Sequence, residues 1–320
     1  MTPSILVTAP LGFLPDLQKR MKTETNLIYA YDATRDEVIE LLESNKFVAW
    51  MVSPCPTYLI DGSLLDLCPT LEIVATPSTG SNHVSVEYLK KKGIQFYSLK
   101  GSEVVNEIVA SSEFTFNLMI SVIRSTPWAF RAVEGGRWRE VESKYRGREL
   151  RELSLGIIGY GRIGSNLAKY SNTFGMTIYA YDPYIEINDE RVTQVDSLEE
   201  MLPQVDVVAV CVHLNDETFH MVDNSLFSMM KKGVYFINTS RGDVVNEDHF
   251  LKYLENGKIK AAGIDVISDE FTGDKHEHKL IAYARTHENL LITPHIAGLT
   301  YDSERKAQTA AYEAIKAKIS

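Results

Sequence analysis

The stretch LGIIGYGRIG, residues 155–164, decides the fold of this 320-residue chain. An apolar run leads into three glycines with the spacing GxGxxG, and the residues that follow, IGSNLAKY, have the pattern of a helix. In this context the first glycine permits a tight turn, the second lets a ligand approach the backbone, and the third lets helix and strand pack closely. The motif predicts that a dinucleotide diphosphate binds at the positive end of the helix. The residues expected to contact it are Gly159, Gly161, Arg162, Ile163 and Gly164.

A carboxylate follows at the end of the next predicted strand. Asp182 closes MTIYAYD (176–182), about 20 residues beyond the glycine loop, where an acid binds the ribose hydroxyls of a dinucleotide. A carboxylate at this place repels a 2′-phosphate, and the next residues, PYIE (183–186), supply no cation. The sequence therefore favours NAD over NADP as the cofactor.

On both sides of the glycine loop, short apolar runs alternate with amphipathic helical patterns. Before the loop, strands are expected at 4–10, 26–32, 46–54, 71–80 and 94–99, and helices at 14–24, 34–44 and 85–93. From the loop onward, strands are expected at 155–159, 176–182, 206–212, 233–240, 261–266 and 290–295, and helices at 162–175, 225–232, 247–257 and 303–320. This alternation is typical of parallel sheets. It predicts an α/β protein with two doubly wound domains, the second starting at residue 103.

Three local features complete this interpretation. Thr34 and Glu37 have the spacing of a helix capping box. Residues 102–125 show one long helical pattern, and residues 127–138, PWAFRAVEGGRW, are expected to form an arm or loop.

The composition excludes several classes of function. With 44% hydrophobic and 24% charged residues the chain is typical of a globular protein, and its net charge of -10 disfavours nucleic acid as a partner. The most apolar run, 108–123, contains Glu113 and is shorter than a membrane span, so we interpret it as a buried or interface helix.

The cysteines and histidines add two further expectations. Three cysteines, without a CxxC spacing or a secretion signal, indicate a cytoplasmic protein without a disulfide framework. No metal-ligand cluster appears in the sequence, and we interpret HEH (276–278) as solvated surface.

Three chemically versatile side chains follow predicted strands of the second domain. Arg241 follows GVYFINTS, Glu270 comes just beyond AAGIDV, and His295 closes LLITPH. Because the carboxyl ends of parallel strands meet at one edge of a sheet, we expect these residues in the same crevice as the glycine loop. His213, at the end of AVCVH, is expected to line the cofactor cleft.

This combination suits hydride transfer between NAD and a 2-hydroxy or 2-keto acid. Reduction of a ketone requires a proton for the developing alkoxide, and histidine supplies one near neutral pH. A carboxylate on the other ring nitrogen fixes the tautomer and favours the imidazolium. An arginine binds the substrate carboxylate with a planar, bidentate geometry.

Several motifs together resemble the D-isomer-specific 2-hydroxyacid dehydrogenases. They occur in that family's order and spacing, and they are LGIIGYGRIG, YDP (181–183), NTSRGDVV (238–245), GIDV (263–266) and TPHIAG (293–298). The resemblance implies that His295 is the acid/base, Glu270 its partner and Arg241 the carboxylate anchor. The further cofactor positions that it implies are His213, Thr218, Thr239 and Asp265, of which Asp265 would hold the nicotinamide carboxamide.

The resemblance also implies a domain arrangement and an assembly. An NAD-binding Rossmann domain, residues 103–296, would be inserted into a flavodoxin-like substrate domain formed by 1–102 and 297–320, and the protein would be a homodimer. The loop PSTGSNHV (77–84) would meet the substrate carboxylate through the amides of Ser78, Thr79 and Gly80.

Departures from the family pattern concern the substrate. Ser78 stands where the family usually has glycine, Asn82 replaces an aspartate, and Asn215 and Phe271 replace prolines. The segment 272–279 is unusually polar. These changes leave the reaction class intact and the identity of the acid open.

One alternative remains from a different class, an NAD(H)-responsive, corepressor-like binding protein on the same fold. The Arg–Glu–His set argues against it, because a pure binder needs no imidazole–carboxylate pair. A methyltransferase on a Rossmann-like sheet explains neither this set nor the glycine loop.

Overall fold

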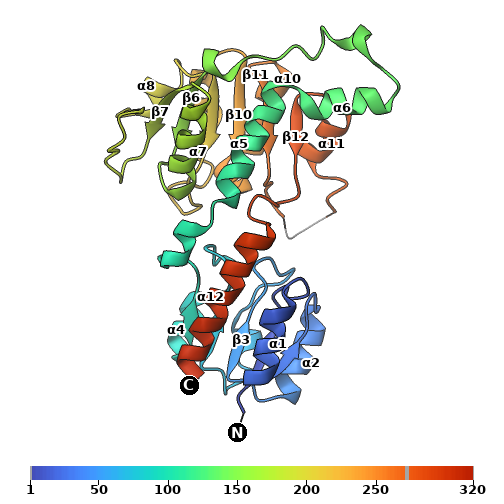
Figure 1. Cartoon of the computed structure of the whole chain (residues 1–320), viewed down its shortest axis with the longest axis vertical. Helices are drawn as coiled ribbons and strands as arrows, with labels where there is room; N and C mark the ends of the chain where they lie inside the picture. Colours follow the sequence, from blue (N-terminus) through green and yellow to red (C-terminus); the bar gives the residue numbers. More distant parts are fainter. Residues whose placement is uncertain (1, 271–273, 320) are drawn as a thin grey trace. The chain divides into compact units, whose positions relative to one another are not determined.

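Two parallel sheets organise the chain (Figure 1). The computed structural model describes residues 2–270 and 274–319. These divide into two compact units, unit 1 with residues 1–108 and 299–320, and unit 2 with residues 109–298. Each unit has its own sheet and its own hydrophobic core.

The sheet of unit 1 has the strand order β2-β1-β3-β4-β5, and all of its pairs are parallel. Its strands are β1 (Ser4–Val7), β2 (Asn26–Tyr29), β3 (Ala49–Met51), β4 (Ile73–Ala75) and β5 (Gln95–Tyr97). This is the flavodoxin-like order 2-1-3-4-5. The central strands β3 and β4 are buried throughout, as expected for a sheet covered on both faces.

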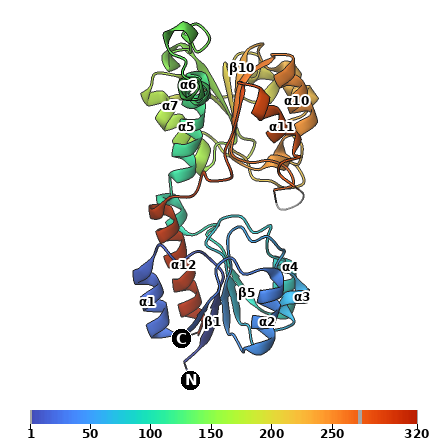
Figure 2. The same cartoon turned by 90° about the vertical axis from the view of Figure 1, so that its right-hand side faces the viewer.

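Helices cover both faces of this sheet (Figure 2). One face carries α1 (Pro15–Glu24) and α12 (Tyr301–Ile319), and the other carries α2 (Arg35–Ser44), α3 (Gly62–Leu65) and α4 (Val86–Lys92). The predicted capping box at the start of α2 is confirmed, with both the Thr34 and the Glu37 side chains bonded to backbone N–H groups. The late helix α12 completes the first core through Ala311, Tyr312 and Ile315.

The sheet of unit 2 has the order β8-β7-β6-β9-β10-β11-β12. Its strands are β6 (Ser154–Ile158), β7 (Thr177–Tyr181), β8 (Val192–Gln194), β9 (Val207–Val210), β10 (Val234–Asn238), β11 (Ile259–Ile264) and β12 (Leu290–Ile292). The order reverses between β6 and β9, and a reversal of this kind is where doubly wound sheets bind ligands. The glycine loop follows β6 and therefore lies at that point.

Two layers of helices enclose this second sheet. One layer has α5 (Ala110–Ile123), α6 (Thr126–Glu134) and α7 (Arg162–Thr173), and the other has α8 (Leu198–Met201), α9 (Asn224–Met229), α10 (Glu247–Glu255) and α11 (Lys279–Thr286). Short 3₁₀ turns complete the description: η1 (Glu103–Glu107), η2 (Arg139–Val141), η3 (Leu150–Glu152) and η4 (Gly242–Val244). The fold class expected from the sequence, two doubly wound parallel α/β domains, is confirmed.

Two local predictions were wrong. The single helix expected at 102–125 is divided into η1 and α5, with extended backbone at Ile108. Ile108 packs with Leu99 and Ala307 in unit 1, whereas α5 packs in unit 2, so the break falls between the two cores. The compact unit 1 correspondingly extends to residue 108. Most of the expected arm, in turn, is the helix α6.

Among the residues that the structure describes, none of the helices has both the length and the apolarity needed to cross a membrane.

Candidate active site

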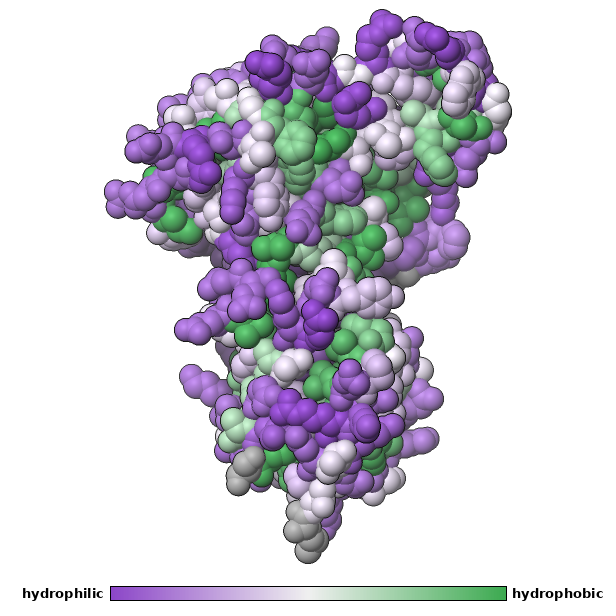
Figure 3. All heavy atoms as spheres, viewed as in Figure 1, coloured by the Kyte–Doolittle hydropathy of each residue, from purple (hydrophilic) through white to green (hydrophobic). Residues whose placement is uncertain are grey.

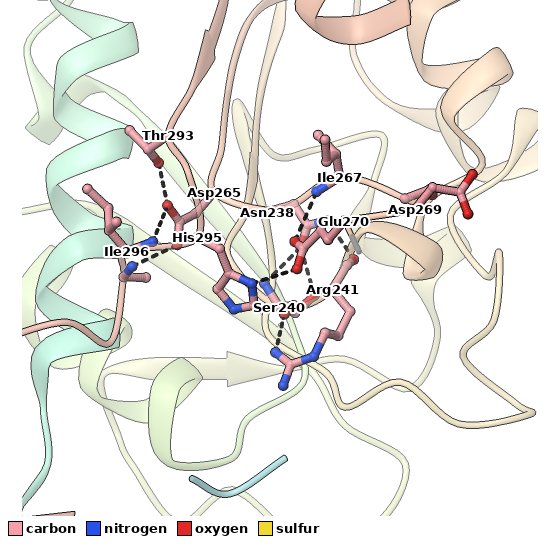
Figure 4. A network of polar contacts seen from close by, with 12 residues as sticks. Asn238, Ser240, Arg241, Asp265, Ile267, Asp269, Glu270, Thr293, His295 and Ile296 are labelled. Atoms are coloured by element: carbon pink, nitrogen blue, oxygen red, sulfur yellow. Dashed lines mark hydrogen bonds and ion pairs between the residues drawn. The ribbon is translucent and has the colours of Figure 1, made fainter. Parts of the chain in front are cut away.

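Three neighbouring strands of unit 2 end level with one another. Asn238 at the end of β10 lies opposite Ile264 of β11, which lies opposite Ile292 of β12. The segments that leave these strands therefore emerge together at one edge of the sheet. They carry the three residues that the sequence predicted to act together, Arg241, Glu270 and His295, and Figure 4 shows these residues in one network of polar contacts.

His295 and Glu270 form a hydrogen-bonded pair. The Nδ1 atom of His295 lies 2.7 Å from Oε2 of Glu270. The second carboxylate oxygen of Glu270 accepts a hydrogen bond from the backbone N–H of Ile267 at 3.3 Å. Because Nδ1 is engaged by Glu270, Nε2 is the ring nitrogen left to exchange a proton with a ligand.

Two residues at this pair adopt an uncommon backbone conformation: His295 itself and Asp269, which directly precedes Glu270. His295 has φ of 54° and Asp269 has φ of 56°, both in the left-handed region that residues other than glycine rarely occupy. Such conformations cost about 1–3 kcal/mol and are often found at functional sites. The turn at His295 is held by its N–H, which donates to the carbonyl of Asp265 at 2.9 Å.

Asp265 organises the segment that carries His295. Its carboxylate accepts hydrogen bonds from the Thr293 hydroxyl at 2.5 Å, from Ile296 N–H at 3.0 Å and from Ala297 N–H at 2.7 Å. The residue is only 1% exposed, and this burial raises the pKa of its carboxyl. Asp265 therefore positions the histidine turn, and its contact with a nicotinamide stays a prediction.

Arg241 is held by the residues between it and β10. The side-chain oxygen of Asn238 accepts from the N–H and hydroxyl of Ser240 at 3.0 and 2.7 Å, and its amide donates to the Arg241 carbonyl at 3.0 Å. One guanidinium nitrogen donates to the Ser240 carbonyl at 2.7 Å. Within the described part of the chain the guanidinium makes no other hydrogen bond, and its five donors leave capacity for a carboxylate ligand.

A glycine joins the Arg241 segment to the Glu270 segment. A Cβ atom on Gly242 would lie 2.0 Å from the carbonyl carbon of Ile267, so only glycine fits without moving backbone. This approach brings the residue after Arg241 against the loop that leads to Glu270. The glycine that follows Arg241 in the sequence is therefore required by this close approach of two backbone segments.

The glycine loop has the form expected of a diphosphate site. Gly159 has φ of 92°, and a Cβ on Gly164 would lie 2.2 Å from the Gly159 carbonyl oxygen. Gly161, directly before α7, has open space where a Cβ would stand. The loop therefore packs tightly at its first and third glycines and leaves its second open to a ligand, which fits a dinucleotide at the helix N-terminus.

Asp182 lies beside this loop at the end of β7. Its two carboxylate oxygens accept hydrogen bonds from the N–H groups of Tyr160 at 2.8 Å and Tyr184 at 2.9 Å. These bonds fix the carboxylate next to the glycine loop, and each oxygen keeps a lone pair for a further donor such as a ribose hydroxyl.

The other predicted cofactor residues already have partners within unit 2. The Thr218 hydroxyl donates to the carbonyl of His213 at 2.6 Å and accepts from the Asn215 N–H at 2.8 Å. The buried Thr239 hydroxyl lies 2.6 Å from that of Thr115 on α5. These contacts shape the loops around the crevice, and direct contacts of His213, Thr218 and Thr239 with a cofactor stay predictions.

The predicted substrate loop belongs to unit 1 and follows β4. The Ser78 hydroxyl donates to the Gly80 carbonyl at 2.8 Å and lies 3.0 Å from the Thr76 hydroxyl. The Thr76 hydroxyl in turn lies 3.0 Å from Nε2 of the buried His83. Thr79 and Gly80 are partly exposed. His83, which the sequence analysis did not single out, thus supports this loop through Thr76.

One expectation about the histidines was wrong. His278, interpreted as solvated surface together with His276, is mostly buried and pairs with Glu247. His278 and Glu247 form no recognisable sequence motif, because they come from different parts of the chain. Phe271, where the family usually has proline, lies outside the described residues.

The chain is similar to known proteins over most of its length. The family described as "D-isomer specific 2-hydroxyacid dehydrogenase, NAD binding domain" matches residues 116–297. A hydroxypyruvate reductase of Thermotoga maritima is 30% identical over 247 residues, which is 77% of each chain. A glyoxylate reductase of Aeropyrum pernix is 34% identical over 260 residues, covering 79% of this chain and 75% of that protein.

Solved structures show the same similarity over nearly the whole chain. A D-lactate dehydrogenase from Aquifex aeolicus, in complex with NAD and lactic acid, has a TM-score of 0.84 and 29% sequence identity. The match covers 99% of this chain and 95% of that one.

Proposed function

The chain belongs to the D-isomer-specific 2-hydroxyacid dehydrogenase family, and from this premise we propose that His295, Glu270 and Arg241 carry its chemistry. The enzyme is an NAD-dependent oxidoreductase of 2-hydroxy and 2-keto acids. The observation that supports the residue assignment most directly is the 2.7 Å contact between His295 Nδ1 and Glu270 Oε2.

His295 acts as the acid/base. In the direction of reduction, Nε2 donates its proton to the oxygen on C2 of the keto acid, and in oxidation it accepts the hydroxyl proton. Glu270 holds the ring in the required tautomer and stabilises the charge of the imidazolium. When bound, NAD(H) supplies or accepts the hydride at C2.

Arg241 binds the carboxylate of the acid. A guanidinium offers two parallel N–H donors to a carboxylate, which fixes both its position and its orientation. The backbone amides of Ser78, Thr79 and Gly80 are proposed to donate to the same carboxylate. The substrate would thus be held at its carboxylate, while C2 and its oxygen are left for reaction with His295.

The residues of the glycine loop are proposed to hold the cofactor. The amides of Arg162 and Ile163 would bind the diphosphate, and Asp182 would bind the ribose hydroxyls. Thr239, Asp265, His213 and Thr218 would lie toward the rest of the dinucleotide. Unit 2 is accordingly the cofactor-binding domain in this proposal, and unit 1 the substrate domain.

Consumption of NADH against a panel of 2-keto acids tests the function. The panel begins with glyoxylate, hydroxypyruvate and pyruvate, which correspond to the acids in the relatives' names, and extends to larger side chains. We expect at least one acid to oxidise NADH, and NADPH to react far more slowly because Asp182 repels its 2′-phosphate. Tight binding of NADH without its oxidation by any acid would instead support a corepressor-like protein.

We also propose a cytoplasmic homodimer. Unit 2 exposes Phe130, Val133 and Trp138 on and after α6, with Phe130 63% and Trp138 69% accessible. Figure 3 shows apolar side chains over α5 and α6 on this face, and such patches are typical of protein interfaces. Sedimentation of the protein purified from the cytoplasmic fraction is expected to give twice the mass of one chain. A monomer at micromolar concentration, or absence from that fraction, would contradict the proposal.

A further inference from the structure

A second histidine–carboxylate pair lies beneath the loop that carries Glu270. Glu247 is the first residue of α10, and its side chain is only 5% exposed. One of its oxygens accepts a hydrogen bond from the Ser268 N–H at 2.7 Å. The other lies 3.3 Å from Nε2 of His278, whose side chain is 12% exposed. A single buried carboxylate therefore binds two residues that are ten positions apart in sequence.

These two residues lie on either side of Glu270. Ser268 precedes it by two positions, and His278 directly precedes α11. The Glu247 carboxylate thus holds the chain at Ser268, two residues before Glu270, and His278 in turn holds the Glu247 carboxylate. Because a chain held two residues away has less conformational freedom, the bond to Ser268 restricts where the Glu270 carboxylate can lie.

The pair is distinct from the surface charges next to it. Lys279 lies 3.9 Å from Glu247 but 2.6 Å from the exposed Asp248, so its main partner is Asp248. Buried ion pairs contribute little net stability compared with well-packed apolar residues. Net stability alone therefore does not account for the Glu247–His278 pair, and its location in the fold suggests what it does. The pair contacts the backbone at Ser268, two residues before Glu270, and Glu270 is the partner of the acid/base histidine.

The His278 ring also has a defined orientation. Its Nε2 carries the proton donated to Glu247, and among residues 2–270 and 274–319 no group bonds its buried Nδ1. The ring therefore serves Glu247 through Nε2 alone.

We propose that Glu247 and His278 are positioning residues that hold Glu270 against Nδ1 of His295. The inference rests on the proposed role of Glu270 as the partner of the acid/base. Neither residue touches the substrate. They act on turnover only through the placement of Glu270, so their effect must disappear when Glu270 can no longer perform its role.

Kinetics of the full-length enzyme on the best acid from the panel test this placement. We expect His278→Leu to lower kcat by about 10-fold, because displacement of a catalytic group by about 1 Å costs up to ~10²-fold. KM for the acid and the affinity for NADH should stay within about 2-fold. His278→Gln, whose amide can still donate to Glu247, should recover most of the loss. Asp248→Asn, which removes only the neighbouring surface pair, is the matched control and should be unchanged.

A double-mutant cycle with Glu270→Gln separates positioning from general damage. In that background His278→Leu should change kcat by less than about 2-fold, because the carboxylate it positions is already absent. A further 10-fold loss there, or no loss in the wild-type background, would overturn the positioning role. Full activity of Glu270→Gln itself would instead overturn the proposed function, and the positioning role with it.

A second variant covers the case in which His278→Leu does not fold. Glu247→Gln keeps the side-chain volume and the acceptor for the Ser268 N–H but removes the charge. We expect it to lower kcat by about 5-fold and to show the same loss of effect in the Glu270→Gln background. It should also shift the pH dependence of kcat, because a displaced Glu270 stabilises the imidazolium less. An unchanged kcat together with an unchanged pH profile would reject the proposal.

Discussion

Replacement of His295 by asparagine is expected to lower kcat for keto-acid reduction by about 10²–10⁴-fold, the usual contribution of a positioned acid–base group. Asparagine is the appropriate substitute because it tolerates the left-handed backbone that His295 adopts, with φ of 54°. The amide cannot deliver a proton near neutral pH, yet the turn held by Asp265 is kept. The measurement is steady-state kcat together with the affinity for NADH, which should change by no more than about 2-fold.

His276→Asn is the matched control for this substitution. His276 is exposed and lies outside the network around Glu270, so its replacement should leave kcat unchanged. Turnover of His295→Asn close to that of the wild type would show that the proton comes from another group.

Arg241→Lys is expected to raise KM for the acid by about 10- to 100-fold. Lysine keeps the positive charge but loses the fork that binds a carboxylate through two N–H groups. One charge-assisted hydrogen bond contributes about 1.5–3 kcal/mol, which corresponds to this range. The backbone contact from Asn238 to the residue 241 carbonyl is retained, so the loop should keep its shape.

The control here is Arg305→Lys on α12, an exposed arginine that pairs with Asp302 at the surface. Both variants are compared by KM for the acid, with NADH saturating. An unchanged KM in Arg241→Lys would mean that the carboxylate is bound elsewhere, for instance by the amides of Ser78–Gly80 alone.

The sequence predicted those parts of the molecule that are determined locally. The glycine loop is recognisable because its requirements are local: Gly159 has a positive φ, Gly164 packs against the Gly159 carbonyl, and Gly161 leaves space for a ligand. Arg241 and His295 were identifiable because parallel strands bring their carboxyl ends to one edge, a rule that needs no knowledge of side-chain packing.

What the sequence did not predict depends on contacts between distant segments. His278 looks like one of several polar residues on a charged stretch, and only the folded chain brings it to Glu247. The three hydrogen bonds of Asp265 depend likewise on residues 293–297 folding beside it. The break at Ile108 falls between residues that pack in different cores, and the continuous helical pattern of the sequence does not reveal that division.

The position of α12 in the chain has a consequence for biosynthesis. Ala311, Tyr312 and Ile315 complete the core under the first sheet, yet they are translated after every residue of unit 2. During synthesis on the ribosome, the sheet of β1 to β5 therefore lacks α12 on one apolar face until the whole cofactor domain has been translated. A half-covered sheet is prone to association with other chains. The nascent polypeptide is thus most vulnerable between synthesis of the first hundred residues and release, and a bound chaperone would protect it during that interval.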